Sequence, residues 1–247
     1  MTFQFHDEVD ELVYDISEPR LLDALNGPLA YWCNHGGRNP PNQDAQYVNT
    51  TYNMFASIDG MGGMANGDIA ARILAEECQR ATLDWGCLEE RMATEIQQKA
   101  SARMSKLGVG GACYALFRVW ENYFRIAHAG DVRVVVLDTE SNVLYQTKDQ
   151  SRGHLVSNAV TGGNPGVVTY TEIQIAAGHT IIAGSDGLWN SCSTKEVAEL
   201  RKGKKAPELL QELKRIALER MNDEQAHPDN INLLVYDLDR IVSHKDA

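Results

Sequence analysis

The sequence is poor in cysteine and contains no CxxC pair. Five cysteines occur in 247 residues, an odd number at irregular spacing, which excludes a disulfide framework and the common structural zinc sites. Unpaired thiols are typical of a reducing compartment, so a cytoplasmic protein is expected. The five are Cys33, Cys78, Cys87, Cys113 and Cys192.

An excess of positive charge and long apolar runs are also missing. The formal net charge is -11, and the densest basic group, at 201–205, reads as a solvated loop, so no nucleic-acid partner is expected. No apolar stretch approaches the roughly 18 residues that a membrane-spanning helix needs, and no membrane association is expected. Residues 1–11 are acidic, whereas a signal peptide begins with basic and continues with apolar residues.

Apolar residues, at 43% of the chain, form grouped blocks without internal repeats or low-complexity linkers, which favours one large domain. Helical spacing predicts helices at 66–81 and 88–105, and start signals predict further helices after Ser193 and at Pro207. Because short turns join most strands, the pattern predicts an α+β fold with antiparallel sheets. Strands are expected at 29–34, 45–49, 53–58, 112–120, 123–129, 132–138, 142–147, 166–175, 179–185 and 231–238.

Residues 1–28 are interpreted as an N-terminal extension, followed by a single domain at 29–240 and a tail at 241–247. Four apolar residues in the extension keep helical spacing within an acidic stretch, which predicts a short amphipathic helix. That helix could dock on the domain itself or recruit a partner. The four are Val9, Leu12, Val13 and Ile16.

Four aspartates stand at the ends of predicted strands or in the turns beside them. Strand ends can direct side chains from distant parts of a sequence to one point, and clustered carboxylates repel one another unless a cation lies among them. Oxygen ligands favour Mg²⁺ or Mn²⁺ over zinc. An Asp-Gly pair is commonly only a turn, so spacing alone indicates no more than a possible cluster. The four are Asp59, Asp131, Asp186 and Asp229.

The segments around these aspartates, "SIDGMGG", "AHAGDVR", "AGSDGLWN" and "HPDNINLL", resemble in sequence and order those of the type 2C metal-dependent protein serine/threonine phosphatases (the PPM family). "NQDA" at 42–45, "GGACYAL" and "AVTGG" are similar to three further family segments. The form DGMGG resembles the bacterial branch. The resemblance covers roughly residues 29 to 238.

The resemblance implies a sandwich of two antiparallel β-sheets flanked by helices, with a dinuclear Mn²⁺ or Mg²⁺ centre. It implies that Asp59 bridges the two metals and that the Gly60 carbonyl binds one of them. Asp186 and Asp229 would complete the other metal's ligands. The remaining implied roles are a water-mediated one for Asp44 and a third, weaker metal shared by Asp131 with Asp186.

The implied activity is hydrolysis of phosphoserine and phosphothreonine in proteins by a hydroxide that bridges the metals, reversing a cognate kinase. Gly60, Gly62 and Gly63 would let the backbone pass close to metal and phosphate. Two alternatives stay open: a small-molecule phosphomonoesterase, and an inactive domain that binds phosphoproteins. A nucleotide-binding loop is excluded because no Gly-Lys-Ser/Thr follows the glycines. We expect a monomer.

Three departures from the family affect the site. Arg38, assigned to the substrate phosphate, lies six residues before Asp44 instead of five. Met61 replaces a histidine proposed as general acid in eukaryotic relatives, and His35 and His128 are interpreted as surface or packing residues. The flap subdomain that should follow "YQTKDQS" is shortened or missing, which predicts an open cleft that accepts small phosphoesters.

Overall fold

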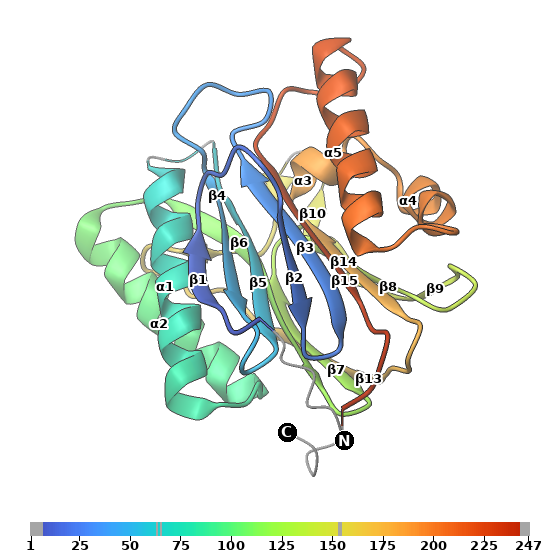
Figure 1. Cartoon of the computed structure of the whole chain (residues 1–247). Helices are drawn as coiled ribbons and strands as arrows, with labels where there is room; N and C mark the ends of the chain where they lie inside the picture. The colour runs from blue at the N-terminus through green and yellow to red at the C-terminus, as the bar shows by residue number, and fades with distance from the viewer. Residues whose placement is uncertain (1–6, 63, 65, 153–154, 243–247) are drawn as a thin grey trace.

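The computed structural model describes residues 7–62, 64, 66–152 and 155–242, and it contains two antiparallel sheets with helices outside (Figure 1). The first sheet has the order β1-β4-β5-β6-β7-β13, with β12 also paired to β6, and the second has the order β2-β3-β15-β14-β8-β9. The first comprises β1 (Asp10–Val13), β4 (Asp44–Asn49), β5 (Met54–Gly60), β6 (Gly111–Trp120), β7 (Tyr123–Ala129), β12 (Val160–Thr161) and β13 (Thr169–Gln174). The second comprises β2 (Arg20–Ala24), β3 (Gly27–Asn34), β8 (Arg133–Leu137), β9 (Val143–Gln146), β14 (Thr180–Gly184) and β15 (Ile231–Asp237).

Helices cover the outer faces of both sheets (Figure 1). α1 (Gly67–Trp85) and α2 (Glu90–Leu107) lie on the first sheet, and α5 (Ala206–Asn222) lies on the second with α4 (Thr194–Arg201) beside it. The short α3 (Asp186–Trp189) follows β14 directly. The expected start signals are present, since the Ser193 side chain accepts a hydrogen bond from the Glu196 amide and Pro207 lies in the first turn of α5. No helix in the described residues is long and apolar enough to cross a membrane.

The core has three layers of buried side chains: between the first sheet and α1 and α2, between the sheets, and between the second sheet and α5. Aromatic rings join the sheets, because Phe55 of β5 lies 5.5 Å from Phe117 and 5.3 Å from Tyr236 of β15. Met92 and Ile96 of α2 are buried, as their spacing predicted. The α+β sandwich with antiparallel sheets and outer helices is therefore confirmed.

The predicted amphipathic helix in the N-terminal extension is wrong. Residues 10–13 form β1, paired with β4, and residues 20–24 form β2, paired with β3. The two adjacent apolar side chains of β1 point to opposite faces, so Leu12 packs toward α1 and α2 while Val13 packs between the sheets. A strand buried on both faces lacks simple alternation, and over so few residues its apolar spacing also fits a helix.

Between β9 and β13 the described residues form only β12 and a separate pair of two-residue strands, β10 (Ser151–Arg152) and β11 (Leu155–Val156). Such short strands carry too few residues for a periodic signal, and the sequence did not predict them. Part of the tail expected at 241–247, residues 243–247, lies outside the described residues, as do residues 1–6 of the extension.

Candidate active site

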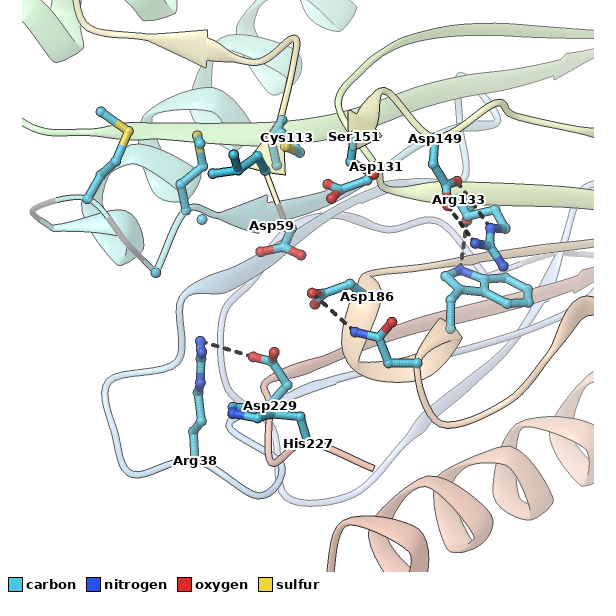
Figure 2. Close-up of a pocket in the computed structure, with 18 residues that line it drawn as sticks. Arg38, Asp59, Cys113, Asp131, Arg133, Asp149, Ser151, Asp186, His227 and Asp229 are labelled. Carbon is cyan, nitrogen blue, oxygen red and sulfur yellow. Dashed lines mark hydrogen bonds and ion pairs between the residues drawn. The ribbon is translucent and has the colours of Figure 1, made fainter. Parts of the chain in front are cut away.

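A cavity of about 840 Å³ is lined by residues that lie at strand ends of both sheets. Asp59 lies near the end of β5 and Asp131 follows β7, while Asp186 begins α3 and Asp229 precedes β15. Figure 2 shows these four carboxylates turned toward one another around the cavity. Four aspartates that are far apart in the sequence thus lie around one space.

Asp44 is not among the residues that line the cavity; it lies directly opposite Asp59 in the pairing of β4 with β5. Its side chain is buried and accepts a 2.6 Å hydrogen bond from the Ser185 hydroxyl. The same hydroxyl accepts a 3.0 Å hydrogen bond from the backbone N–H of Asn232 in β15. Asp44 is therefore fixed between the two sheets, and its predicted action through water stays a prediction.

The carboxylates repel one another because few positive groups lie among them. Burial, together with Asp44 and Asp186, holds the pKa of Asp59 well above its usual range. Burial likewise raises the pKa of Asp44, against the hydrogen bond from Ser185. Burial and Asp186 raise the pKa of Asp229 to about 6, and burial raises the pKa of Asp131. Ionisation of these carboxyl groups is therefore unfavourable unless a positive charge lies among them.

The donor set suits a hard divalent cation, because the converging side chains offer carboxylate oxygens and their mutual repulsion needs a positive charge. Within the part of the chain that the structure describes, no group of three or more His, Cys, Asp or Glu side chains is arranged so that it could hold a metal ion by itself. The aspartates instead surround an open cavity, an arrangement suited to ions such as Mg²⁺ that keep part of their water shell.

The backbone at Gly60 runs too close to its neighbours for a side chain. A Cβ at this position would lie 2.3 Å from the Gly67 carbonyl oxygen and 2.5 Å from that of Gln43. The Gly60 amide donates a 3.0 Å hydrogen bond to the same Gln43 oxygen, so the approach is part of the fold. At Gly62 a Cβ would meet the Gln43 and Arg38 side chains instead. Gly63 lies outside the described residues.

We expect Gly60→Ala to lower the free energy of unfolding by about 3 kcal/mol, since backbone atoms on both sides must move to admit the methyl group. Urea denaturation followed by circular dichroism measures this change. Gly163→Ala is the control, because a Cβ there meets nothing within 4 Å and only its positive φ of 84° opposes the change. Its cost should be about 1 kcal/mol. Equal losses in the two variants would contradict the prediction.

Arg38 lines the cavity from the loop between β3 and β4 and forms an ion pair with Asp229 of the cluster (Figure 2). Its Nη1 lies 3.0 Å from Asp229 Oδ1 and 3.4 Å from Gln43 Oε1. The Arg38 side chain is 37% exposed. The positively charged Arg38 side chain therefore lies at the cavity wall opposite the other aspartates, where an incoming anion can reach it.

Two separate sets of hydrogen bonds hold both ends of the loop that carries Arg38. In the first, the Asn230 side chain donates to the His35 carbonyl at 2.9 Å and accepts from the Gln43 amide at 3.0 Å. In the second, Asp15 accepts hydrogen bonds from the Asn34 side chain and the His35 amide, at 3.1 Å and 3.2 Å. This second set also includes Tyr14, whose carbonyl accepts a hydrogen bond from the Asn42 side chain at the other end of the loop.

A buried polar bridge beneath the cavity was not predicted from the sequence. The Asn232 Oδ1 of β15 accepts from Gln46 Nε2 at 2.6 Å and from the Ser57 hydroxyl at 2.7 Å, and so joins the two sheets. Its Nδ2 donates to the Ala45 carbonyl at 2.6 Å. The available signal was the polar Asn232 inside the otherwise apolar strand "INLLVY", because a buried amide needs partners.

The wall farthest from Arg38 in Figure 2 carries a second arginine that sequence reasoning also missed. Arg133 forms a two-point ion pair with Asp149, at 3.2 Å and 2.6 Å, and its guanidinium lies 5.2 Å from the centre of the Trp189 ring. The charges of Arg133 and Asp149 therefore offset each other. Cys113 also lines the cavity. Burial, and to a smaller extent the negative charge of Asp131, raises the pKa of its thiol.

The histidines interpreted as packing or surface residues lie outside the cavity lining. His128 is buried, and neither ring nitrogen has a hydrogen-bond partner among the side chains and backbone groups described. His35 faces Asp15, with Nδ1 at 3.3 Å from the carboxylate. Met61 lines the cavity. His227, which was not predicted from the sequence, also lines it (Figure 2).

Three solved structures share this fold over nearly their whole length. PppA, a key regulatory component of T6SS in Pseudomonas aeruginosa, aligns with 91% of this chain and 98% of its own, at a TM-score of 0.69 and 21% identity. The Mycobacterium tuberculosis serine/threonine phosphatase PstP/Ppp aligns with 86% of this chain and 98% of its own, at 0.70 and 20%. The serine/threonine phosphatase Stp1 from Staphylococcus aureus aligns with 84% of this chain and 93% of its own, at a TM-score of 0.66 and 16% identity.

The catalytic domain of PstP has also been solved in complex with 2 manganese ions, at a TM-score of 0.71 and 21% identity. No family model and no curated protein matches the sequence. At these identities the likeness establishes the fold, which is that of the PPM-type serine/threonine phosphatases. The sandwich implied by the sequence motifs is confirmed, whereas the assignment to a DGMGG branch stays a prediction.

Proposed function

We propose that this protein hydrolyses phosphoserine and phosphothreonine in proteins, using Mn²⁺ or Mg²⁺. One observation carries the proposal: four aspartates and an arginine converge on a single cavity in a fold shared with serine/threonine phosphatases. A cluster of carboxylates alone would repel a phosphate. The same cluster with divalent cations bound would attract it.

Asp59, Asp186 and Asp229, with the Gly60 carbonyl, would hold two cations, and Asp131 with Asp186 would hold a third, weaker one. When bound, two such ions lower the pKa of a water molecule between them and neutralise charge on the phosphoryl oxygens. The chain itself keeps Asp59 in place through the β4–β5 pairing with Asp44.

Arg38 would bind the phosphoryl group of the substrate. Its planar guanidinium suits two oxygens of a phosphate, and it already pairs with a carboxylate, Asp229, at 3.0 Å. Because Asp229 would also serve as a metal ligand, Arg38 would be free to turn from Asp229 toward the phosphoryl group. Met61, in the position of the histidine of eukaryotic relatives, has a thioether that donates no proton.

The experiment is phosphate release from a phosphothreonine peptide and from p-nitrophenyl phosphate, with Mn²⁺, with Mg²⁺ and with EDTA, in the parent and in Asp186→Ala. Activity that needs added metal and collapses in the variant would support the proposal. A rate confined to p-nitrophenyl phosphate would favour the small-molecule phosphomonoesterase. A folded parent without turnover under any condition would favour the inactive binding module.

The wider setting is also a proposal. Phosphoserine and phosphothreonine imply a cognate kinase that places the phosphate, so we assign the protein to signalling, acting as a monomer. The five cysteines are free, and four of them are buried, which supports a reducing compartment such as the cytoplasm.

We expect Asp15→Ala to raise KM for p-nitrophenyl phosphate about fivefold with kcat nearly unchanged. The substitution removes hydrogen bonds to one end of the Arg38 loop, worth about 1 kcal/mol, without touching the aspartate cluster. Steady-state kinetics separates the two constants. Glu18→Ala is the control, because Glu18 is 81% exposed and contacts Lys214 instead. A fall in kcat alone would place Asp15 in a different role.

A further inference from the structure

The rim of the cavity carries apolar side chains that the phosphate chemistry does not use. Leu155 of β11 lines the cavity and is 76% exposed. Met64, between β5 and α1, also lines the cavity and is 41% exposed. Their neighbours Val156 and Met61 also line the cavity but pack in part against the core between the sheets. Strand alternation turns Val156 inward and leaves Leu155 outward.

Exposure of a leucine to this degree is unfavourable, because an apolar side chain in water gains free energy by burial. Among the described residues nine large apolar side chains are strongly exposed, and Met64 and Leu155 are the two of these nine that line the cavity. An apolar group from a ligand that enters the cavity can therefore bury Leu155.

The cavity is larger than the phosphorylated side chain needs. At about 840 Å³ it falls within the range of roughly 300–1,000 Å³ typical of pockets that enclose whole drug-sized ligands. Arg38 and the aspartates account for the phosphoryl group on one side. The remaining volume, continuous with the phosphate site and bordered by Leu155 and Met64, is available to residues next to the phosphorylated one.

The second arginine does not turn this volume into a charge-selective site. Arg133 and Asp149 pair through two contacts, at 3.2 Å and 2.6 Å, so each charge already has a partner. Trp189 beside them is buried, with 7% of its surface exposed, and its indole nitrogen donates to the Gly184 carbonyl at 3.1 Å. Arg133 and Asp149 therefore present no unpaired charge to a residue next to the phosphorylated one.

We propose that the preferred substrates are phosphopeptide segments with a large aliphatic side chain beside the phosphorylated residue, which packs on Leu155 and Met64. This inference rests on the proposed phosphatase function and names its substrate class. The aliphatic side chain buries apolar surface of Leu155 while Arg38 and the metal-loaded aspartates hold the phosphate. Leu155 is thus a specificity-determining residue.

The test compares two phosphothreonine peptides, one with leucine and one with serine at both positions flanking the phosphothreonine, with Mn²⁺ present. In the parent, kcat/KM should be about fivefold higher for the leucine peptide. In Leu155→Ser the ratio between the two peptides should fall to about one. Leu144→Ser is the matched control, because Leu144 of β9 is 48% exposed and does not line the cavity, so its ratio should equal that of the parent.

Equal kcat/KM values for the two peptides in the parent would overturn the inference while leaving the phosphatase function standing. So would an unchanged ratio in Leu155→Ser. Absence of turnover with both peptides and with p-nitrophenyl phosphate would overturn the phosphatase function instead. In that case fluorescence anisotropy with the same two peptides, now labelled, tests the peptide preference by binding. The parent should bind the leucine peptide more tightly than the serine peptide, and Leu155→Ser should lose that difference; any other result would overturn the preference.

Discussion

Replacing Asp59 with asparagine is expected to lower kcat/KM for a phosphothreonine peptide by about a thousandfold. An amide carries no charge and offers one acceptor oxygen, so it cannot bridge two cations in the way proposed for Asp59. Metal ions supply several kcal/mol of charge stabilisation in the transition state, and about 4 kcal/mol corresponds to a thousandfold in rate. Initial rates with saturating Mn²⁺ measure the loss.

The same substitution should make the metal-free protein more stable. Burial and the adjacent carboxylates hold the pKa of Asp59 well above its usual range, which means that its negative charge is unfavourable in the fold. Thermal unfolding in EDTA should therefore show a higher Tm for Asp59→Asn than for the parent. Asp84→Asn, at an exposed position of α1, is the control and should leave both rate and Tm unchanged. A less stable Asp59→Asn would show that the carboxylate has a structural partner in the fold.

Mn²⁺ is expected to raise the Tm of the metal-free protein by about 5–10 °C at about pH 7.5, and by much less at about pH 4.5. At a concentration of about 100 times Kd, a ligand stabilises by roughly 2.7 kcal/mol, and each kcal/mol moves Tm by about 2–4 °C in a chain of this size. Cation binding requires ionised carboxylates, so protons compete with the metal at the lower pH.

Without metal, stability should fall as pH rises from about 4 to neutrality. The carboxyls of the cluster have raised pKa values in the fold, so the native protein holds protons that the unfolded chain releases in this window. For Asp229 the window ends at a pKa of about 6. Urea midpoints in EDTA across this range measure the trend, and Asp59→Asn should flatten it. Stability that rises with pH would contradict the charge crowding described for the cavity.

The sequence predicted the parts of the site that depend on strand ends. Asp59, Asp131 and Asp186 follow or end apolar runs long enough to be recognised as strands, and antiparallel strands return their ends to shared positions. The longer helices were also predictable, because their buried residues repeat with helical spacing along α1 and α2. Local pattern was sufficient wherever an element was long and buried on one face.

The remaining features depend on contacts between segments that have no local signature. Asp15 in the N-terminal segment meets His35 because β1 and β2 belong to different sheets, which brings the residues between them to the end of β3. Arg133 and Asp149 meet across β8 and the segment after β9. Side chains such as these look like ordinary surface residues in the sequence, since their partners are chosen by the tertiary fold.

The short edge strands β1 and β2 cover β4 and β3, one in each sheet, and both come from one short stretch of chain. A chain shortened to begin at Leu29 would leave β4 and β3 as open edge strands, each with a row of unpaired backbone donors and acceptors. Edges of this kind pair readily with other chains. Intermolecular strand pairing and aggregation are therefore the first expected result of that truncation.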